Sequence, residues 1–351
     1  MNNKKYTIGL TTGDINGIGL EVLLKTFADN RIYERITPVL YGNAKVVAFH
    51  RKALNLNAIN SVNQKNAERL QFNTLNIIQC YEDEVQVQLG VQNEVGGAYG
   101  RKSLEAATTD LLSGKLDALV TAPINKNNIQ SSTFSYTGHT EYLAAKTNQE
   151  PLMILINDAL RIATVTNHVP VQDVAPLIKR DRIERKIDIL HHSLRRDFGI
   201  DKPRIALLGL NPHAGDNGLI GKEEINEIIP AITNGKQKGR LLFGPFSADG
   251  FFGSGQYQSY DAILAMYHDQ GLVPFKTLSF TSGTNYTAGL DIVRTAPDHG
   301  TGFDIAGRNK ANEDSFRQSL FTALDILDHR EAYDERYANP INRQELSKER
   351  Q

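Results

Sequence analysis

Short apolar runs that alternate with longer amphipathic stretches constrain this chain of 351 residues most strongly. Runs that we predict as strands cover residues 6–10, 36–41, 116–121, 152–156, 161–166, 204–210 and 262–267. Buried strands of a parallel sheet have this length and apolar character, and the stretches between them leave room for crossover helices. The pattern therefore predicts an α/β fold with a largely parallel sheet.

Three of the intervening stretches have the period of surface helices. Residues 100–115, 181–197 and 316–327 carry apolar side chains near a 3.6-residue spacing, with charged side chains on the opposite face. We expect them to cover the sheet rather than to form a site. No internal repeat or Gly/Ser linker divides the chain, so composition marks no domain boundary, and the polar tail after Asn339 is expected to fray.

Composition excludes several classes of function. Lys plus Arg total 39 against 40 Asp plus Glu, and this near-neutral balance provides no field for gathering nucleic acid. The single Cys80 cannot form an intrachain disulfide or a cysteine-based zinc cluster, which fits a reducing compartment. No apolar run reaches the ~18 residues of a membrane span, and the N-terminal run is too short for a signal peptide. We expect a cytoplasmic protein without membrane or nucleic-acid partners.

Three histidines follow or end predicted strands: His168, His213 and His268. Ligands of open parallel sheets bind outside the carboxyl ends of the strands, so these imidazoles could meet at one edge. Three neutral imidazoles suit zinc or a related divalent ion with one position open for substrate. A single histidine after a strand is more often an ordinary loop residue. Three histidines that each stand at the end of a predicted strand favour a shared metal site.

Several segments suit anion binding. The glycine-rich first turn, residues 13–19, follows a predicted strand and has the geometry of an anion cradle, although its glycines do not fit the Rossmann fingerprint. His139 and Thr140 stand where a helix begins, and they either hold an anion or merely cap that helix. Lys276 and Arg294, each in a predicted short loop, are the basic candidates. The glycine-rich run 297–312 is too polar for a core element and is interpreted as a functional loop.

Taken together, these residues resemble the 4-hydroxythreonine-4-phosphate dehydrogenase family of vitamin B6 biosynthesis over nearly the whole chain. The motifs that carry the resemblance are Gly13-Asp14-x-x-Gly17-Ile18-Gly19-x-Glu21, Val120-Thr-Ala-Pro-Ile-Asn-Lys126, Gly138-His-Thr-Glu141, Asn167-His168, Leu210-Asn-Pro-His-Ala-Gly215, Gly244-Pro-x-x-Ala-Asp249, Tyr267-His-Asp-Gln-Gly271 and Arg294-Thr-x-x-Asp-His-Gly-Thr301. The loop from Asp298 to Gly307 is also similar to the nucleotide loop of isocitrate and isopropylmalate dehydrogenases.

The resemblance implies α/β/α layers of the isocitrate/isopropylmalate dehydrogenase type, with two subdomains and an active-site cleft between them. One subdomain would hold residues 1–135 and about 290–351. The other would hold about 136–289, with the metal ligands and the interface of a homodimer. The first turn departs from the commoner family pattern because Ile15, Asn16 and Leu20 replace Pro, Ala and Pro.

Site roles are also implied by the resemblance. The implied ligands of a divalent metal (Zn, Mg or Co), shared between two subunits, are His168, His213 and His268. The implied substrate contacts are His139, Thr140, Lys276, Asn285 and Arg294. The implied contacts to the adenosine part of NAD or NADP are His299, Gly300, Thr301 and Asp304.

The implied reaction is oxidation of 4-phosphohydroxy-L-threonine to a 3-keto acid, which loses CO₂ and gives 3-amino-2-oxopropyl phosphate. A metal on the reacting oxygen would stabilise the charge that develops in both steps. The alcohol proton would pass to Asp249, Asp269 or a metal-bound hydroxide, and we count Lys276 among the catalytic residues as well as the substrate contacts. The two aspartates have an alternative role, which is only to orient histidine ligands.

Other functions remain open at this point. A relative with the same metal and anion residues could oxidise another phosphorylated four-carbon acid, such as erythronate 4-phosphate. A metal-dependent hydrolase or aldolase would also use three histidines. A sugar-phosphate-binding module would bind the ligand without reducing a nicotinamide.

Overall fold

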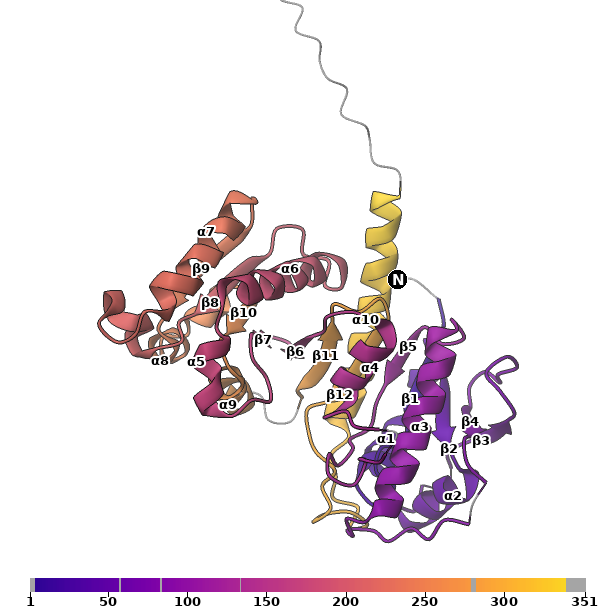
Figure 1. The fold of residues 1–351 in the computed structure, drawn as a ribbon. Coiled ribbons are helices and arrows are strands. Elements are labelled where there is room, and N and C mark those ends of the chain that lie inside the picture. Colours follow the sequence, from indigo (N-terminus) through magenta and orange to yellow (C-terminus); the bar gives the residue numbers. More distant parts are fainter. Residues whose placement is uncertain (1–3, 57, 83, 133, 279–281, 339–351) are drawn as a thin grey trace, which may run out of the picture.

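The computed structural model describes residues 4–338 except 57, 83, 133 and 279–281. Within these residues the strands form one twelve-stranded sheet in the order β3-β4-β2-β1-β5-β12-β11-β6-β7-β10-β8-β9 (Figure 1). The strands are β1 (Tyr6–Thr11), β2 (Ile36–Gly42), β3 (Ser61–Gln64), β4 (Leu75–Gln79), β5 (Ala118–Val120), β6 (Leu152–Ile156), β7 (Arg161–Thr164), β8 (Arg204–Leu208), β9 (Leu241–Phe246), β10 (Ala262–Ala265), β11 (Thr284–Ala288) and β12 (Val293–Pro297).

Helices cover both faces of this sheet. The α-helices are α1 (Gly19–Phe27), α2 (Ala44–Ala53), α3 (Glu94–Leu112), α4 (His139–Thr147), α5 (Val174–Leu177), α6 (Arg180–Arg196), α7 (Ile229–Gln237), α8 (Ala248–Gly253), α9 (His268–Leu278) and α10 (Asp314–Tyr337). The shorter helical turns are η1 (Asn30–Glu34), η2 (Val171–Asp173), η3 (Pro212–Gly218), η4 (Glu224–Ile228) and η5 (Gln256–Ser259). The three predicted helices correspond to α3, α6 and α10.

The sheet consists of two parallel blocks joined by antiparallel pairs. Strands β1 to β5 and β12 form one parallel block, and β7 to β10 form the other. Between the blocks, β11 runs antiparallel to β12 and β6, and β6 runs antiparallel to β7. All seven predicted strands are present. The expected largely parallel order is correct within each block and wrong at the centre, because four-residue connections cannot make a parallel crossover.

Apolar side chains make the core continuous on one face of the sheet and divided on the other. A single cluster joins α1, α6 and α10 to the sheet across both blocks. On the opposite face, one cluster holds α3 and α4 and a separate cluster holds α8 and α9. This arrangement is the expected α/β/α layering. The apolar layer on the divided face has a gap over the central strands. This gap agrees with a division into two subdomains. The exact boundaries of the subdomains remain a prediction.

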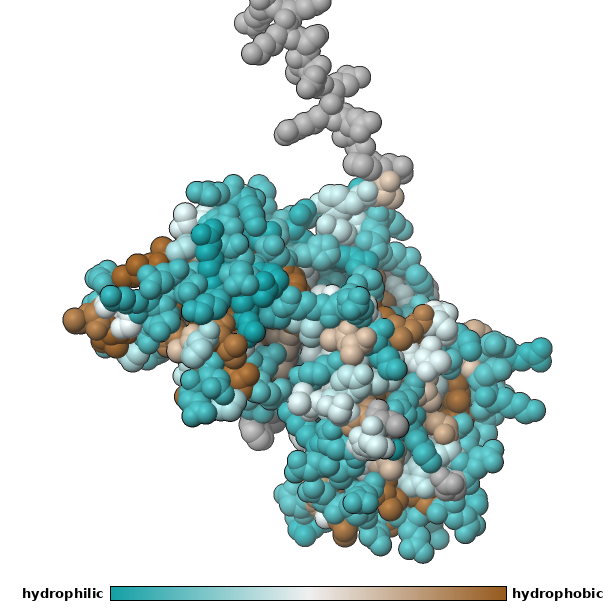
Figure 2. Space-filling model, viewed as in Figure 1, coloured by the Kyte–Doolittle hydropathy of each residue, from teal (hydrophilic) through white to brown (hydrophobic). Residues whose placement is uncertain are grey.

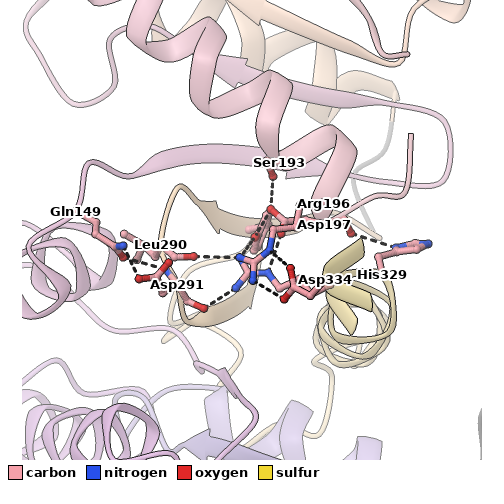
Figure 3. A network of polar contacts seen from close by, with 10 residues as sticks. Gln149, Ser193, Arg196, Asp197, Leu290, Asp291, His329 and Asp334 are labelled. Atoms are coloured by element: carbon pink, nitrogen blue, oxygen red, sulfur yellow. Dashed lines mark hydrogen bonds and ion pairs between the residues drawn. The ribbon is translucent and has the colours of Figure 1, made fainter. Parts of the chain in front are cut away.

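A buried polar network fixes the continuous face where the two blocks meet (Figure 3). Arg330 of α10 donates from Nε to Asp197 Oδ1 at 2.7 Å, and the Tyr286 hydroxyl of β11 donates to Asp197 Oδ2 at 2.7 Å. Arg330 also donates to the carbonyls of Leu290 and Asp291, in the connection between β11 and β12. The network therefore ties α6, α10 and the central strands together.

Two sequence expectations concern the whole chain. In the part of the chain that the structure describes, no helix is long and apolar enough to cross a membrane. The predicted frayed tail after Asn339 lies outside the described residues.

Candidate functional site

A cavity of about 310 Å³ lies over the central strands, in the gap between the two divided apolar clusters. Its floor includes Leu155 of β6, Asn285 of β11 and Arg294 of β12, and Asn285 pairs directly with Leu155 in the sheet. The start of α4 and the helix α9 contribute to its walls. Residues from both parts of the chain thus form one cavity, at the cleft that the sequence predicts.

This cavity brings most of the predicted site residues together. The predicted residues that line it are His139, Thr140, His168, His268, Lys276, Asn285, Arg294, His299 and Gly300. Those that do not line it are His213, Asp249, Asp269, Thr301 and Asp304. The predicted substrate contacts are therefore all present in one place, whereas the predicted metal, base and nucleotide groups are only partly assembled by a single chain.

Arg294 is a buried cation without a matching anion. Its side chain is 3% exposed, and its guanidinium donates to the hydroxyls of Thr121 (Nε, 3.0 Å) and Thr287 (Nη1, 3.2 Å). Among the described residues no carboxylate lies within ion-pair distance, and burial lowers the pKa of Arg294 to about 10. An unpaired buried charge is unfavourable, so this position is suited to an anionic ligand.

Three buried polar atoms in the cavity wall also lack partners among the described residues. They are Nε2 of His139, Oδ1 of Asn285 and Nε2 of His299. Burial and the nearby Arg294 charge lower the pKa of His139, which keeps its imidazole neutral. Buried polar groups are nearly always hydrogen-bonded, so their concentration in one cavity indicates a polar ligand. No side chain caps α4, which speaks against the simple capping role for His139 and Thr140.

Two of the predicted metal ligands lie beside each other. The rings of His168 and His268 are 5.7 Å apart between centroids. The carboxylate of Asp269 accepts a hydrogen bond from His268 Nδ1 at 2.6 Å, which leaves the lone pair on Nε2 free for a ligand. Lys126 Nζ lies 3.0 Å from His168 Nε2. Among the described residues of one chain, no group of three His, Cys, Asp or Glu side chains is placed to hold a metal.

His213 occupies a left-handed turn next to β8. Residues 213–217 all have positive φ values, between 41° and 80°, which costs energy for residues other than glycine. The buried carboxylate of Glu224 holds this turn, because it accepts the N–H groups of Leu210 and Asn211 at 2.8 Å each. His213 thus lies at the same sheet edge as the other two histidines, since β7, β10 and β8 are parallel neighbours, but outside the cavity.

The two predicted base residues lie outside the cavity of the single chain. Asp249 lies in the first turn of α8, and a hydrogen bond from Ser247 lowers the pKa of its carboxyl group. Asp269 is exposed and orients His268. Within the cavity wall, Asp298 has its Oδ2 3.8 Å from Lys276 Nζ, and burial raises the pKa of Asp298.

Sequence reasoning assigned no role to Lys126, Glu141 or Asp298, although all three line the cavity. Each of them stands inside a quoted motif, so the signal was present. What the motifs lacked was the spatial arrangement, which places Glu141 3.8 Å from His168 and Asp298 beside Lys276.

Several amide groups of the glycine-rich first turn already donate to protein acceptors: Asp14 N to the Pro123 carbonyl at 3.0 Å, Gly17 N to the Asp14 carbonyl at 3.1 Å, and Ile18 N to the Thr301 carbonyl at 2.9 Å. These amides are engaged within the protein, which does not favour the anion-cradle interpretation. The turn instead supports the 298–307 loop, the segment expected to contact the nucleotide.

Comparison with known proteins agrees with the fold and the motifs. A family model described as "Pyridoxal phosphate biosynthetic protein PdxA" matches residues 34–323. The 4-hydroxythreonine-4-phosphate dehydrogenase of Bacteroides thetaiotaomicron is 47% identical over 350 residues, covering 99% of this chain and 96% of that protein. A crystal structure of 4-hydroxythreonine-4-phosphate dehydrogenase from Klebsiella pneumoniae superposes with a TM-score of 0.78 at 35% identity, covering 93% of this chain and 99% of the other.

The isocitrate dehydrogenase of Methylococcus capsulatus superposes with a TM-score of 0.50 at 14% identity, covering 94% of this chain and 89% of that one. At this identity the likeness concerns the fold alone. It confirms the predicted isocitrate dehydrogenase-like architecture.

Proposed function

Because the chain belongs to the pyridoxal phosphate biosynthetic protein PdxA family, we propose that it is a 4-hydroxythreonine-4-phosphate dehydrogenase that uses NAD or NADP. Its substrate is then 4-phosphohydroxy-L-threonine, which is oxidised to a 3-keto acid. Loss of CO₂ from this acid gives 3-amino-2-oxopropyl phosphate, for pyridoxal phosphate synthesis. The alternative, oxidation of another acid such as erythronate 4-phosphate, is not favoured, because relatives that match over almost the whole chain carry the first name.

The observation that best supports a doubly anionic substrate is the placement of Arg294 and Lys276 in one cavity, which Lys126 also lines. Arg294 is buried in the floor without a carboxylate partner, and Lys276 of α9 lines the wall with its side chain 45% exposed. The substrate carries a carboxylate and a phosphate, and charge-assisted hydrogen bonds to such groups are among the strongest available. Neutral His139 and Asn285 supply polar atoms that orient the ligand between these charges.

A divalent metal (Zn, Mg or Co) fits the donor set, since His168 and His268 lie together and Asp269 fixes the tautomer of His268. We propose these two imidazoles as ligands, with His213 supplied by a second copy of the chain in a homodimer. When bound, the ion supplies Lewis-acid stabilisation to an oxygen that becomes negative. The rigid turn that holds His213 away from the cavity of its own chain supports this sharing.

Proton transfer during alcohol oxidation needs an acceptor within hydrogen-bonding reach of the hydroxyl group. Asp249 and Asp269 remain the proposed acceptors for a site that a second subunit completes. Within one chain, Asp298 lines the cavity beside Lys276. The Asp298 carboxylate could therefore accept a proton there, next to the positive charge of Lys276. Oxidation itself transfers a hydride to the nicotinamide, and His299 and Gly300 bring the proposed nucleotide loop to the cavity rim, with Thr301 and Asp304 following.

Metal removal and product analysis test this proposal. The enzyme is treated with a chelator, then restored with Zn²⁺, Mg²⁺ or Co²⁺, and assayed for reduced nicotinamide and CO₂ from 4-phosphohydroxy-L-threonine. We expect both products to disappear with the metal and to return with it in equal amounts. A metal-dependent hydrolase or aldolase would consume the substrate without reduced nicotinamide, and a binding module would bind without turnover. The cytoplasmic location expected from the sequence stays a prediction.

A further inference from the structure

Asn16 in the first turn has a fully buried side chain that the proposed chemistry does not use. Its amide Nδ2 donates to Asn93 Oδ1 at 3.0 Å, and its Oδ1 accepts from the Gln88 N–H at 2.8 Å. Its main-chain carbonyl accepts from the Gly90 N–H at 2.9 Å. Three hydrogen bonds from a single residue therefore attach the irregular segment 88–93 to the first turn.

Segment 88–93 in turn packs closely against the end of the 298–307 loop. A Cβ atom added at Gly90 would lie 2.9 Å from the Phe303 carbonyl oxygen. A Cβ atom added at Gly307 would lie 2.8 Å from the Leu89 side chain. At distances below 3.0 Å a neighbouring atom must move to admit a methyl group, so the loop and the segment are in direct contact.

The first turn contacts the same loop from another side. The Ile18 N–H donates to the Thr301 carbonyl, and a Cβ atom added at Gly17 would lie 2.5 Å from that carbonyl oxygen. Gly302 packs against the Ile18 side chain in the same way. Residues 301–307 thus lie against two supports, the first turn and segment 88–93. Asn16 belongs to the first turn, and its hydrogen bonds to segment 88–93 join the two supports.

We propose that Asn16 is a positioning residue for nucleotide binding, because it fixes the relative placement of the two supports that hold the 298–307 loop. The inference rests on the proposed function, in which this loop contacts the nucleotide. When a loop is already held in its binding conformation, ligand binding does not have to bear the entropic cost of ordering it, so the affinity is higher. Asn16 does not line the cavity, so we expect its replacement to affect nucleotide binding rather than substrate binding.

The variant Asn16→Ala tests the inference, with Asn76→Ala as the matched control. Asn76 of β4 is equally buried, and its amide donates to the Pro38 and Gln71 carbonyls, away from the 298–307 loop. We expect Asn16→Ala to raise both the Kd of NADH or NADPH and the KM of the oxidised nucleotide about five- to tenfold. Substrate KM and kcat at saturating nucleotide should stay within about twofold. Because the chain has no tryptophan, nucleotide fluorescence reports binding without overlap from that residue.

Each outcome is decisive. Asn76→Ala should lower the Tm while leaving nucleotide Kd within about twofold of the wild type. If Asn16→Ala lowers the Tm but leaves nucleotide Kd unchanged, or weakens substrate and nucleotide alike, the inference is wrong. If Asn16→Ala does not fold, Asn16→Asp keeps the acceptor for Gln88 and removes the donor to Asn93, and it must still raise nucleotide Kd. A wild-type protein that binds neither nucleotide contradicts the proposed function itself, which is a separate result.

Discussion

Two buried arginines differ in the way that their charge is balanced. Arg330 is paired with Asp197 at 2.7 Å and also bonded to main-chain carbonyls, so its environment is complete without a ligand. Arg294 has hydroxyl partners but no carboxylate among the described residues. The sequence named Arg294 as a basic candidate, and the family resemblance implied that it contacts the substrate, whereas Arg330 was assigned no role. The missing anion of Arg294 and the paired carboxylate of Arg330 are properties of the three-dimensional arrangement, which the sequence alone could not predict.

The substitution Arg294→Met tests this difference. We expect kcat/KM for the phosphorylated substrate to fall at least about 100-fold, because a buried charge-assisted contact is lost. The free energy of unfolding of the ligand-free protein should change by less than about 1 kcal/mol, or increase, because an unpaired buried charge is removed. Steady-state kinetics and denaturant unfolding measure the two effects.

Arg330→Met is the matched control for Arg294→Met. Removing Arg330 leaves Asp197 buried without its cation, so unfolding free energy should fall by about 3–5 kcal/mol. Equal losses of stability in the two variants, with substrate KM unchanged in Arg294→Met, would show that both arginines are structural.

His50, which is hydrogen-bonded to the first turn, should make the free energy of unfolding depend on pH. Its buried Nε2–H donates to the Ile15 carbonyl at 3.0 Å, and burial lowers the pKa of His50 to about 4. The unfolded chain takes up a proton near pH 6.5, whereas the folded chain does so only near pH 4. Stability is therefore lost as the pH falls through this window, by up to about 3 kcal/mol from this group. Denaturant unfolding at several pH values should show that loss in the wild type and a shallower one in His50→Gln.

At the scale of elements, seven of the twelve described strands were predicted from apolar runs, whereas β3, β4, β9, β11 and β12 were not. The runs found in the sequence are interior strands whose side chains are mostly buried. β3 was missed because its side chains at the sheet edge are partly exposed and mostly polar. β11 was missed because polar Asn285 and Thr287 flank Tyr286, which breaks the apolar run. Asn285 lines the cavity, and Thr287 accepts a hydrogen bond from Arg294. The antiparallel centre follows from the short connections 157–160 and 289–292, whose length is visible in the sequence but is informative only once both flanking strands are recognised.

Alanine at two glycines of the candidate nucleotide region should weaken nucleotide binding at both positions but lower stability at only one of them. Gly17→Ala places a methyl group 2.5 Å from the Thr301 carbonyl oxygen, so we expect about 1–3 kcal/mol of destabilisation together with weaker nucleotide binding. Gly300 faces open space, so Gly300→Ala should leave the Tm unchanged but raise nucleotide KM, because the ligand must fill that space. Thermal unfolding and kinetics measure both variants.

Gly250→Ala controls for the loss of a glycine, since a methyl group there meets no atom within 4 Å. An unchanged nucleotide KM in Gly300→Ala would place the nucleotide elsewhere.

At the scale of the whole molecule, the cavity depends on both parallel blocks. The N-terminal half supplies His139, Lys276 comes from α9, and Arg294 comes from the strand that returns to the first block. In Figure 2 a largely hydrophilic surface covers both parts, with apolar patches scattered over it. The family resemblance located these residues along the chain, but their convergence required the fold. The separate position of His213 indicates that a single chain holds part of the proposed metal site.

The most direct test of this account is a steady-state comparison of 4-phosphohydroxy-L-threonine with erythronate 4-phosphate, using metal-loaded enzyme and both NAD and NADP. The absorbance of reduced nicotinamide is the readout. We predict turnover of 4-phosphohydroxy-L-threonine with at least one nucleotide, with kcat/KM at least about tenfold above that for erythronate 4-phosphate, in which a hydroxyl group replaces the amino group. Failure to reduce either nucleotide with 4-phosphohydroxy-L-threonine, or a clear preference for erythronate 4-phosphate, would contradict it.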